Sequence, residues 1–131
     1  MPTLEAKPRY QGKPMNNREL ADNLCAVSSA LTDARLLHVK HFGTLVPHVF
    51  MGDVLKRIGW CLEDAKRSRH VDHDSEVAAI LDALERGMTI GDRETRNVIS
   101  LSFSADCEVE AFFTRLRPLL GPKVLAGIPA R

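Results

Sequence analysis

The residues that could do chemistry are most concentrated in the segment 44–53. There an otherwise apolar run is interrupted by Pro47, His48, Gly52 and Asp53. A histidine general base needs a positioned proton to remove and usually a carboxylate that orients its ring. His48 and Asp53 are five residues apart and therefore too far round a helix to pair directly. We expect His48 to be a buried, hydrogen-bonded structural residue. The alternative is that Gly52, one turn after His48, leaves space beside the imidazole ring for a ligand.

The rest of the chain supplies no motif that would complete a catalytic set. It contains no G-x-S-x-G, no glycine-rich phosphate loop and no H-E-x-x-H. Two pairs of histidines, His38 with His41 and His70 with His73, have a spacing that could share a metal on a helix. Neither pair has an obvious third ligand nearby in sequence. We therefore predict no catalytic residue, no metal site and no cofactor.

The spacing and surroundings of the three cysteines also give no sign of redox or metal chemistry. Cys25, Cys61 and Cys107 form no CxxC pair and lie among apolar residues. Buried free thiols in a reducing cytosol are the expected state. The N-terminal segment has no apolar stretch suited to a signal peptide, and no run reaches membrane-spanning length. We expect a cytoplasmic protein that does not associate with a membrane.

Small polar residues in the segment 97–104 form a second candidate surface. Asn97, Ser100 and Ser104 would share one face of a helix. Tight helix packing, with the hydroxyls bonded to carbonyls one turn earlier, is the first interpretation. A polar binding surface is the second.

Acidic residues cluster in one segment of a chain whose net charge is only +1. Between residues 72 and 94 the chain has seven acids and two bases. The acids are Asp72, Asp74, Glu76, Asp82, Glu85, Asp92 and Glu94. They could be a solvated helix face, or they could contact a basic partner. The short basic run of Lys66, Arg67 and Arg69 is a weak footprint for nucleic acid, so no direct nucleic-acid binding is expected.

We expect helices to position these groups, because no segment alternates apolar and polar residues long enough for a convincing strand. The pattern predicts an all-α single domain of about five antiparallel helices, either a bundle or a short solenoid-like stack. Residues 1–15 are expected to form a flexible arm, 16–122 the helical domain and 123–131 a short tail. The first helix should run from Asn16 or Asn17 to just before Gly43, and the second should begin at Pro47.

N-cap residues predict where the later helices begin. Asp74 or Ser75 can cap the third helix, and Gly87 and Gly91 fit its frayed end. Asp92 should cap the fourth and Asp106 a fifth, which Pro118 ends or kinks.

Three segments together resemble a family of short bacterial helical proteins without an established activity. They are Leu45-Val-Pro-His-Val-Phe-Met-Gly-Asp53, Arg96-Asn-Val-Ile-Ser-Leu-Ser-Phe103 and Leu116-Arg-Pro-Leu-Leu-Gly121. The resembling stretch covers about residues 45–122, in the same order. Members of that family look like immunity partners of polymorphic bacterial toxins, so the resemblance implies a protein partner and supplies no catalytic residue.

The leading hypothesis is a non-enzymatic immunity protein that binds and occludes a cognate toxin domain from contact-dependent or related interbacterial competition. Many such toxins act on nucleic acid and carry basic clefts, which the acidic segment could contact. Two rivals remain. One is a small enzyme or ligand-binding domain with a pocket near His48, and the other is a nucleic-acid-binding regulator. Oligomeric state is left open.

Overall fold

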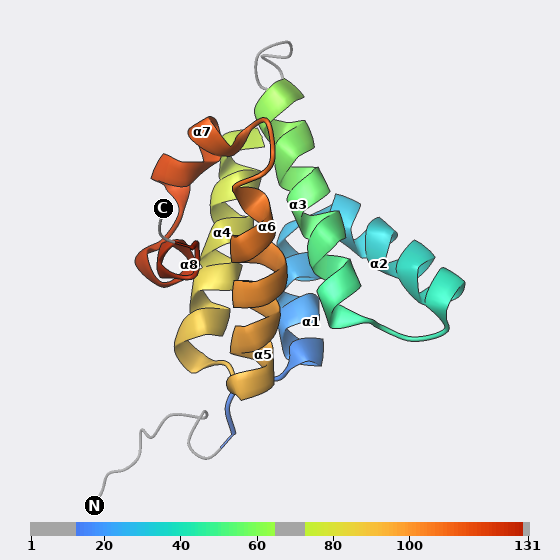
Figure 1. Ribbon diagram of the computed structural model, residues 1–131. Coiled ribbons are helices and arrows are strands. Elements are labelled where there is room, and N and C mark those ends of the chain that lie inside the picture. Colours follow the sequence, from blue (N-terminus) through green and yellow to red (C-terminus); the bar gives the residue numbers. More distant parts are fainter. Residues whose placement is uncertain (1–12, 65–72, 130–131) are drawn as a thin grey trace, which may run out of the picture.

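A computed structural model describes residues 13–64 and 73–129 and shows an all-α single domain (Figure 1). The predicted fold class is confirmed. The α-helices are α1 (Asn17–Val27), α2 (Ser29–Phe42), α3 (Pro47–Asp64), α4 (His73–Ile90), α5 (Arg93–Val98), α6 (Ala105–Cys107), α7 (Phe113–Leu116) and α8 (Pro122–Ala126). A π-helix, η1 (Ile99–Ser104), joins α5 to α6, and a 3-10 turn, η2 (Arg117–Leu119), follows α7.

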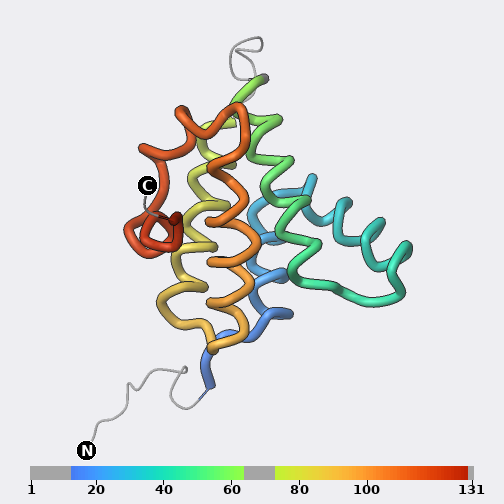
Figure 2. Tube along the Cα trace, in the orientation of Figure 1, coloured from blue at the N-terminus to red at the C-terminus, as the bar shows by residue number. Residues whose placement is uncertain are grey.

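Helix α4 is the centre of the bundle. It packs against α1, α3, α8 and the continuous helix formed by α5, η1 and α6. Along the chain, α3, α4 and the α5–η1–α6 helix run alternately in opposite directions (Figure 1). Helix α2 projects from the side of the bundle opposite α8 (Figure 2). Among the described residues, no helix has the length and apolarity that crossing a membrane requires.

Only 5% of the residues are aromatic, and aliphatic side chains form most of the core. Leu24, Ile58, Ile80 and Leu84 are fully buried, and Phe103 is a central aromatic residue among them. Burying an aliphatic side chain of this size contributes about 1.5–3 kcal/mol relative to leaving it exposed. The packing of α1, α3, α4 and η1 against one another is therefore the main source of stability.

The first predicted helix is two helices, because the chain breaks at Ser28. Asn16 and Glu19 form the expected capping box of α1, with distances of 2.8 and 2.9 Å between side-chain oxygens and backbone nitrogens. Ser28 has extended backbone angles, and its hydroxyl caps α2 by accepting from the Leu31 N–H at 3.2 Å. The same hydroxyl donates to Glu76 at 2.7 Å. The break therefore anchors the α1–α2 corner to α4.

Two later helix starts agree with the sequence, and two do not. Helix α4 begins at His73, so Asp74 and Ser75 lie inside its first turn. Helix α3 begins at Pro47, and the Asp92 carboxylate caps α5 by accepting from the Thr95 N–H at 2.7 Å. The predicted fifth helix from Asp106 is wrong. The preceding helix continues through η1 to Cys107, so Asp106 lies inside it, and turns follow before α7.

Both ends of the described chain pack more closely than the sequence indicated. The Met15 N–H donates to the Ile90 carbonyl, and the Met15 carbonyl accepts from the Asp92 N–H, each at 2.8 Å. Helix α8 lies mostly within the segment assigned to the C-terminal tail, and its Val124 is 1% exposed. Gly87 is not at a frayed end. It lies buried within α4, where a Cβ would come within 2.7 Å of Ile99 Cδ1.

Candidate functional site

A groove of about 570 Å³ runs along α4 beside the C-terminal segment of the chain. Its lining residues are Asp74, Val77, Ala78, Leu81, Asp82, Glu85, Leu119 and Gly121. We call it the α4 groove. The α4 residues are spaced three and four apart, so they occupy one face of the helix. Leu119 of η2 and Gly121 form the opposite wall.

The α4 groove combines an apolar floor with a negatively charged rim. Val77 and Leu81 are buried at its base, whereas Asp74 and Asp82 are exposed. Among the described residues that line it, none is basic. Three of the seven predicted contact acids, Asp74, Asp82 and Glu85, therefore converge on one surface. This arrangement suits a ligand that is apolar in the middle and cationic at its flanks.

Glu85 also has a structural role at the edge of the groove. Its two carboxylate oxygens accept from the backbone N–H groups of Lys123 at 2.8 Å and Val124 at 3.0 Å. These are donors in the first turn of α8, which the helix itself cannot satisfy. Gly121 permits this arrangement, because a Cβ there would overlap the Glu85 carboxylate. Glu85 therefore attaches α8 to α4.

Glu76 lies away from the groove and is bound inside the bundle. Its carboxylate accepts a bidentate interaction from Arg57 of α3, at 2.7 Å from Nε and 2.8 Å from Nη2. Ser28 donates to the same carboxylate. The hydrogen bonds from Arg57 lower the pKa of Glu76 to about 2, with a smaller contribution from Ser28, against an opposing effect of desolvation. Glu76 is therefore ionised at neutral pH and is not available to a protein partner.

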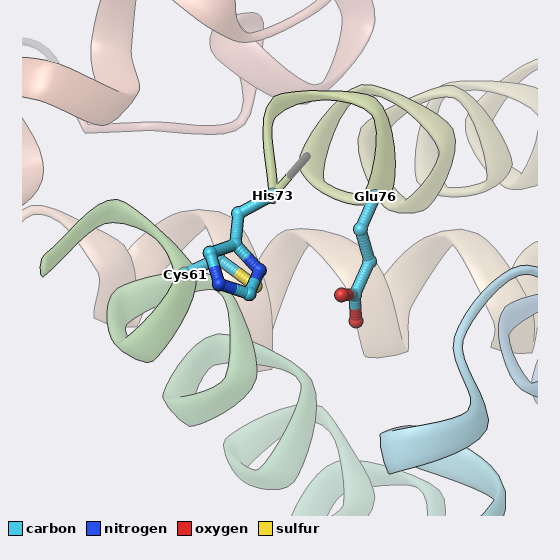
Figure 3. A group of neighbouring side chains, drawn as sticks. All are labelled: Cys61, His73 and Glu76. Atoms are coloured by element: carbon cyan, nitrogen blue, oxygen red, sulfur yellow. The ribbon is translucent and has the colours of Figure 1, made fainter. Parts of the chain in front are cut away.

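Cys61 and His73 complete a buried polar cluster with Glu76. Cys61 lies on α3 and is fully buried, and His73 begins α4 and is 4% exposed. One ligand atom from each of the three side chains lies within 4.8 Å of the others (Figure 3). The Trp60 ring contacts the His73 ring edge-on at 5.0 Å between centroids. Arg57 lies 4.5 Å over the same Trp60 ring, so it connects the cluster to the surface of α3.

The sequence did not predict that Cys61 joins this cluster or that Arg57 binds to it. The available signal was weak. Arg57 and Cys61 are four residues apart on α3, and His73 and Glu76 are three apart on α4. Each pair therefore presents its side chains on one helix face. Only the packing of α3 against α4 brings the two faces together.

The remaining predicted acids do not join the groove. Asp92 is the N-cap of α5, and its backbone N–H donates to the Met15 carbonyl of the N-terminal segment. Glu94 is exposed in the first turn of α5. Asp72 lies outside the described residues, as do Lys66, Arg67, Arg69 and His70.

His48 is not the buried histidine that the sequence predicted. It is exposed at the start of α3, and its Nδ1 is hydrogen-bonded to the hydroxyl of Ser102 in η1. Apart from its chain neighbours and the backbone of its own helix, a Cβ at Gly52 would meet no described atom within 4 Å. Gly52 therefore faces open space and does not receive a neighbouring helix. Gly59 is the glycine of α3 that meets a close neighbour, the ring of Phe112.

His38 is a buried structural histidine. It is 5% exposed, and its Nε2 accepts from the Val46 N–H at 2.9 Å. This bond places the ring proton on Nδ1, which lies 3.7 Å from an Asp53 carboxylate oxygen. The pair fixes the turn between α2 and α3. Asp53, in the second turn of α3, therefore orients His38 and does not orient His48.

The polar residues of the segment 97–104 are dispersed. Asn97 is exposed, Ser100 lies 3.8 Å from the Met88 sulfur, and Ser104 is buried and donates to the Val124 carbonyl at 2.9 Å. The predicted bonds to carbonyls one turn earlier are replaced by contacts with α4 and α8. The wider π-helical turn of η1 explains the dispersal, because it rotates side chains away from their α-helical positions.

Comparisons with protein-family models, with curated proteins and with solved structures found no match for this chain. The resemblance to a family of short bacterial helical proteins stays a prediction. Any functional interpretation therefore depends on the groove and the clusters described above.

Proposed function

We propose that this protein is a non-enzymatic binding protein whose α4 groove receives a basic, amphipathic segment of a protein partner. In its most concrete form, it is an immunity protein that occludes a cognate toxin domain of interbacterial competition, such as a nuclease. The observation that carries the proposal is the convergence of Asp74, Asp82 and Glu85 around an apolar floor. Resemblance to immunity-like proteins supports the choice of partner class.

The chemistry of the groove defines what the partner must present. Apolar side chains would cover Val77 and Leu81 and remove their remaining accessible surface from water. Lys or Arg side chains at the flanks would form charge-assisted hydrogen bonds with Asp74 and Asp82. Complementary charge also accelerates encounter, most strongly at low ionic strength. A groove of about 570 Å³ holds only a few side chains, so inhibition would come from the bulk of the bundle covering the partner's site.

The rival pocket near His48 receives less support from the contacts. His48 bonds to Ser102, Asp53 lies near His38, and Ser100 lies near Met88. These residues therefore have three separate partners and do not converge on one reacting position.

Co-purification with the product of the neighbouring gene tests the proposal, followed by titration calorimetry of the complex. Asp82→Lys should weaken binding at least tenfold, because it places a positive charge against the partner's cations. Glu94→Lys is the matched control, since Glu94 is an exposed acid outside the groove. It should bind like the wild type and still protect cells that express the partner.

Two results would overturn the proposal. One is the absence of both a complex and protection of cells that express the neighbouring product. The other is equal weakening by Asp82→Lys and Glu94→Lys, which would show that net charge, and not the α4 groove, governs binding.

A further inference from the structure

We propose that Cys61, His73 and Glu76 form a binding site for a divalent transition-metal ion of the zinc class, between α3 and the first turn of α4. The inference is independent of the proposed function, because the groove and this cluster lie on different faces of α4. Glu76 contacts Arg57 and Ser28, whereas the groove residues face η2 and α8.

The geometry supports one ion held by three side chains. The three ligand atoms lie within 4.8 Å of one another. In a tetrahedral zinc site with bonds of about 2.0–2.3 Å, neighbouring ligand atoms are roughly 3.3–3.6 Å apart. Side-chain shifts on the order of 1 Å would close the cluster around an ion. Figure 3 shows the His73 ring beside the Cys61 sulfur, with the Glu76 carboxylate directed toward the same space.

The donor set selects the class of ion. A thiolate and an imidazole favour zinc, copper or cobalt over magnesium and calcium, which prefer oxygen ligands. One thiolate and one carboxylate would balance the two positive charges of the ion, and the thiol proton would be released to solvent on binding. With three protein ligands, the fourth coordination position would be open to water.

The surroundings of Glu76 resemble the outer shell of a metal site. Ligating carboxylates are commonly hydrogen-bonded by neighbouring residues that fix their orientation. Arg57 and Ser28 hold the Glu76 carboxylate in this way, at 2.7–2.8 Å. Because Arg57 adds a positive charge beside the ion, we expect weaker binding than in a structural zinc site built from four thiolates and imidazoles.

Cobalt titration of the chelator-treated full-length protein tests the site. Co²⁺ should produce a thiolate-to-metal charge-transfer band and the visible absorption of tetrahedral cobalt, saturating at one ion per chain. Adding Zn²⁺ should abolish both signals. Cys61→Ser should remove the charge-transfer band, and His73→Gln should weaken binding about tenfold or more. Circular dichroism should show that both variants keep their helical content.

Two other cysteines provide matched controls. Cys107 is fully buried, and desolvation raises the pKa of its thiol to about 11, so it resists forming a thiolate. Cys25 is half-buried, and its thiol donates to the Leu31 carbonyl. Cys107→Ser and Cys25→Ser should keep the cobalt band. Absence of the band in the wild type, or its persistence in Cys61→Ser, would overturn the proposal.

Discussion

Glu76 and Asp82 are acids on the same helix, six residues apart, but they have different environments. The Glu76 side chain is 18% exposed and is held by Arg57 and Ser28 inside the bundle. Asp82 is exposed on the rim of the α4 groove. Six residues are about one and two-thirds helical turns, which places the two side chains on different faces of α4. Glu76 therefore stabilises the fold, whereas Asp82 remains exposed to solvent.

The same division separates the other acids of this segment. Glu85 and Asp92 accept from backbone N–H groups at the starts of α8 and α5. Asp74 and Glu94 are exposed. A cluster of acids in a sequence is therefore not by itself a charged surface, because several of its members can be used to satisfy helix ends and buried cations.

The largest effect on stability is expected from Glu76→Gln. The substitution removes the charge that pairs with the partly buried Arg57 and weakens its two hydrogen bonds. We expect the free energy of unfolding to fall by about 2–3 kcal/mol, as for hydrogen bonds to charged groups. Urea denaturation monitored by circular dichroism measures it. An unchanged midpoint would show that the interior face of α4 does not depend on this pair.

The pH dependence of stability should report on the same carboxylate. The pKa of Glu76 in the folded protein is about 2, below the ordinary value of 4.5. A depressed folded-state pKa stabilises the fold at pH values above the unfolded-state pKa, and this contribution is lost as pH falls from about 4.5 toward 2. The wild type should therefore lose stability over this range more steeply than Glu76→Gln. Parallel curves from acid titrations of both proteins would contradict the assignment.

Glu85→Gln should produce a smaller and more local effect. An amide offers one oxygen where the carboxylate offers two, so one of the N–H groups of Lys123 and Val124 loses its acceptor. We expect a loss of about 1–2 kcal/mol, typical of a helix cap. Hydrogen exchange at the Val124 amide should become faster. If exchange in α8 is unchanged, Glu85 belongs with the exposed rim and not with the structural acids.

Local signals in the sequence were sufficient to place several helix ends. The Asn16–Glu19 box, Pro47 and Asp92 each act within three residues of themselves, so the pattern alone predicts them. The break at Ser28 was missed. Its hydroxyl is fixed partly by Glu76, 48 residues later in the chain, and the apolar periodicity continues across it. A cap that depends on a distant partner has no local signature.

The candidate site was predictable only in part, for a similar reason. Helical spacing places Asp74, Val77, Ala78, Leu81, Asp82 and Glu85 on one face, so the rim and floor of the groove could be anticipated from α4. The opposite wall comes from residues 119 and 121, whose position depends on the turns after Cys107. The burial of His38 was also not predictable, because it depends on how the α2–α3 turn folds back onto α2.

Asp92→Ala should cost about 1 kcal/mol, the usual effect of removing an N-cap side chain. The variant loses the bond from the Thr95 N–H to the Asp92 carboxylate, but keeps the backbone contact with Met15. Thermal unfolding measures the change. Asp106→Ala is the control, because Asp106 lies within a helix and caps none. Equal losses in the two variants would mean that negative charge, and not the cap, is the stabilising feature.

Asp82→Asn should have the smallest effect on the fold. Asp82 is exposed at the rim of the α4 groove. Surface substitutions of this kind usually change the free energy of unfolding by no more than about 0.5 kcal/mol. Urea denaturation of Asp82→Asn and Glu76→Gln under the same conditions compares the two acids directly, because both substitutions remove one negative charge from α4. A loss above about 1 kcal/mol would show that Asp82 stabilises the bundle. The contrast between a structural Glu76 and an Asp82 that is free to bind would then fail, since both acids would be needed for folding.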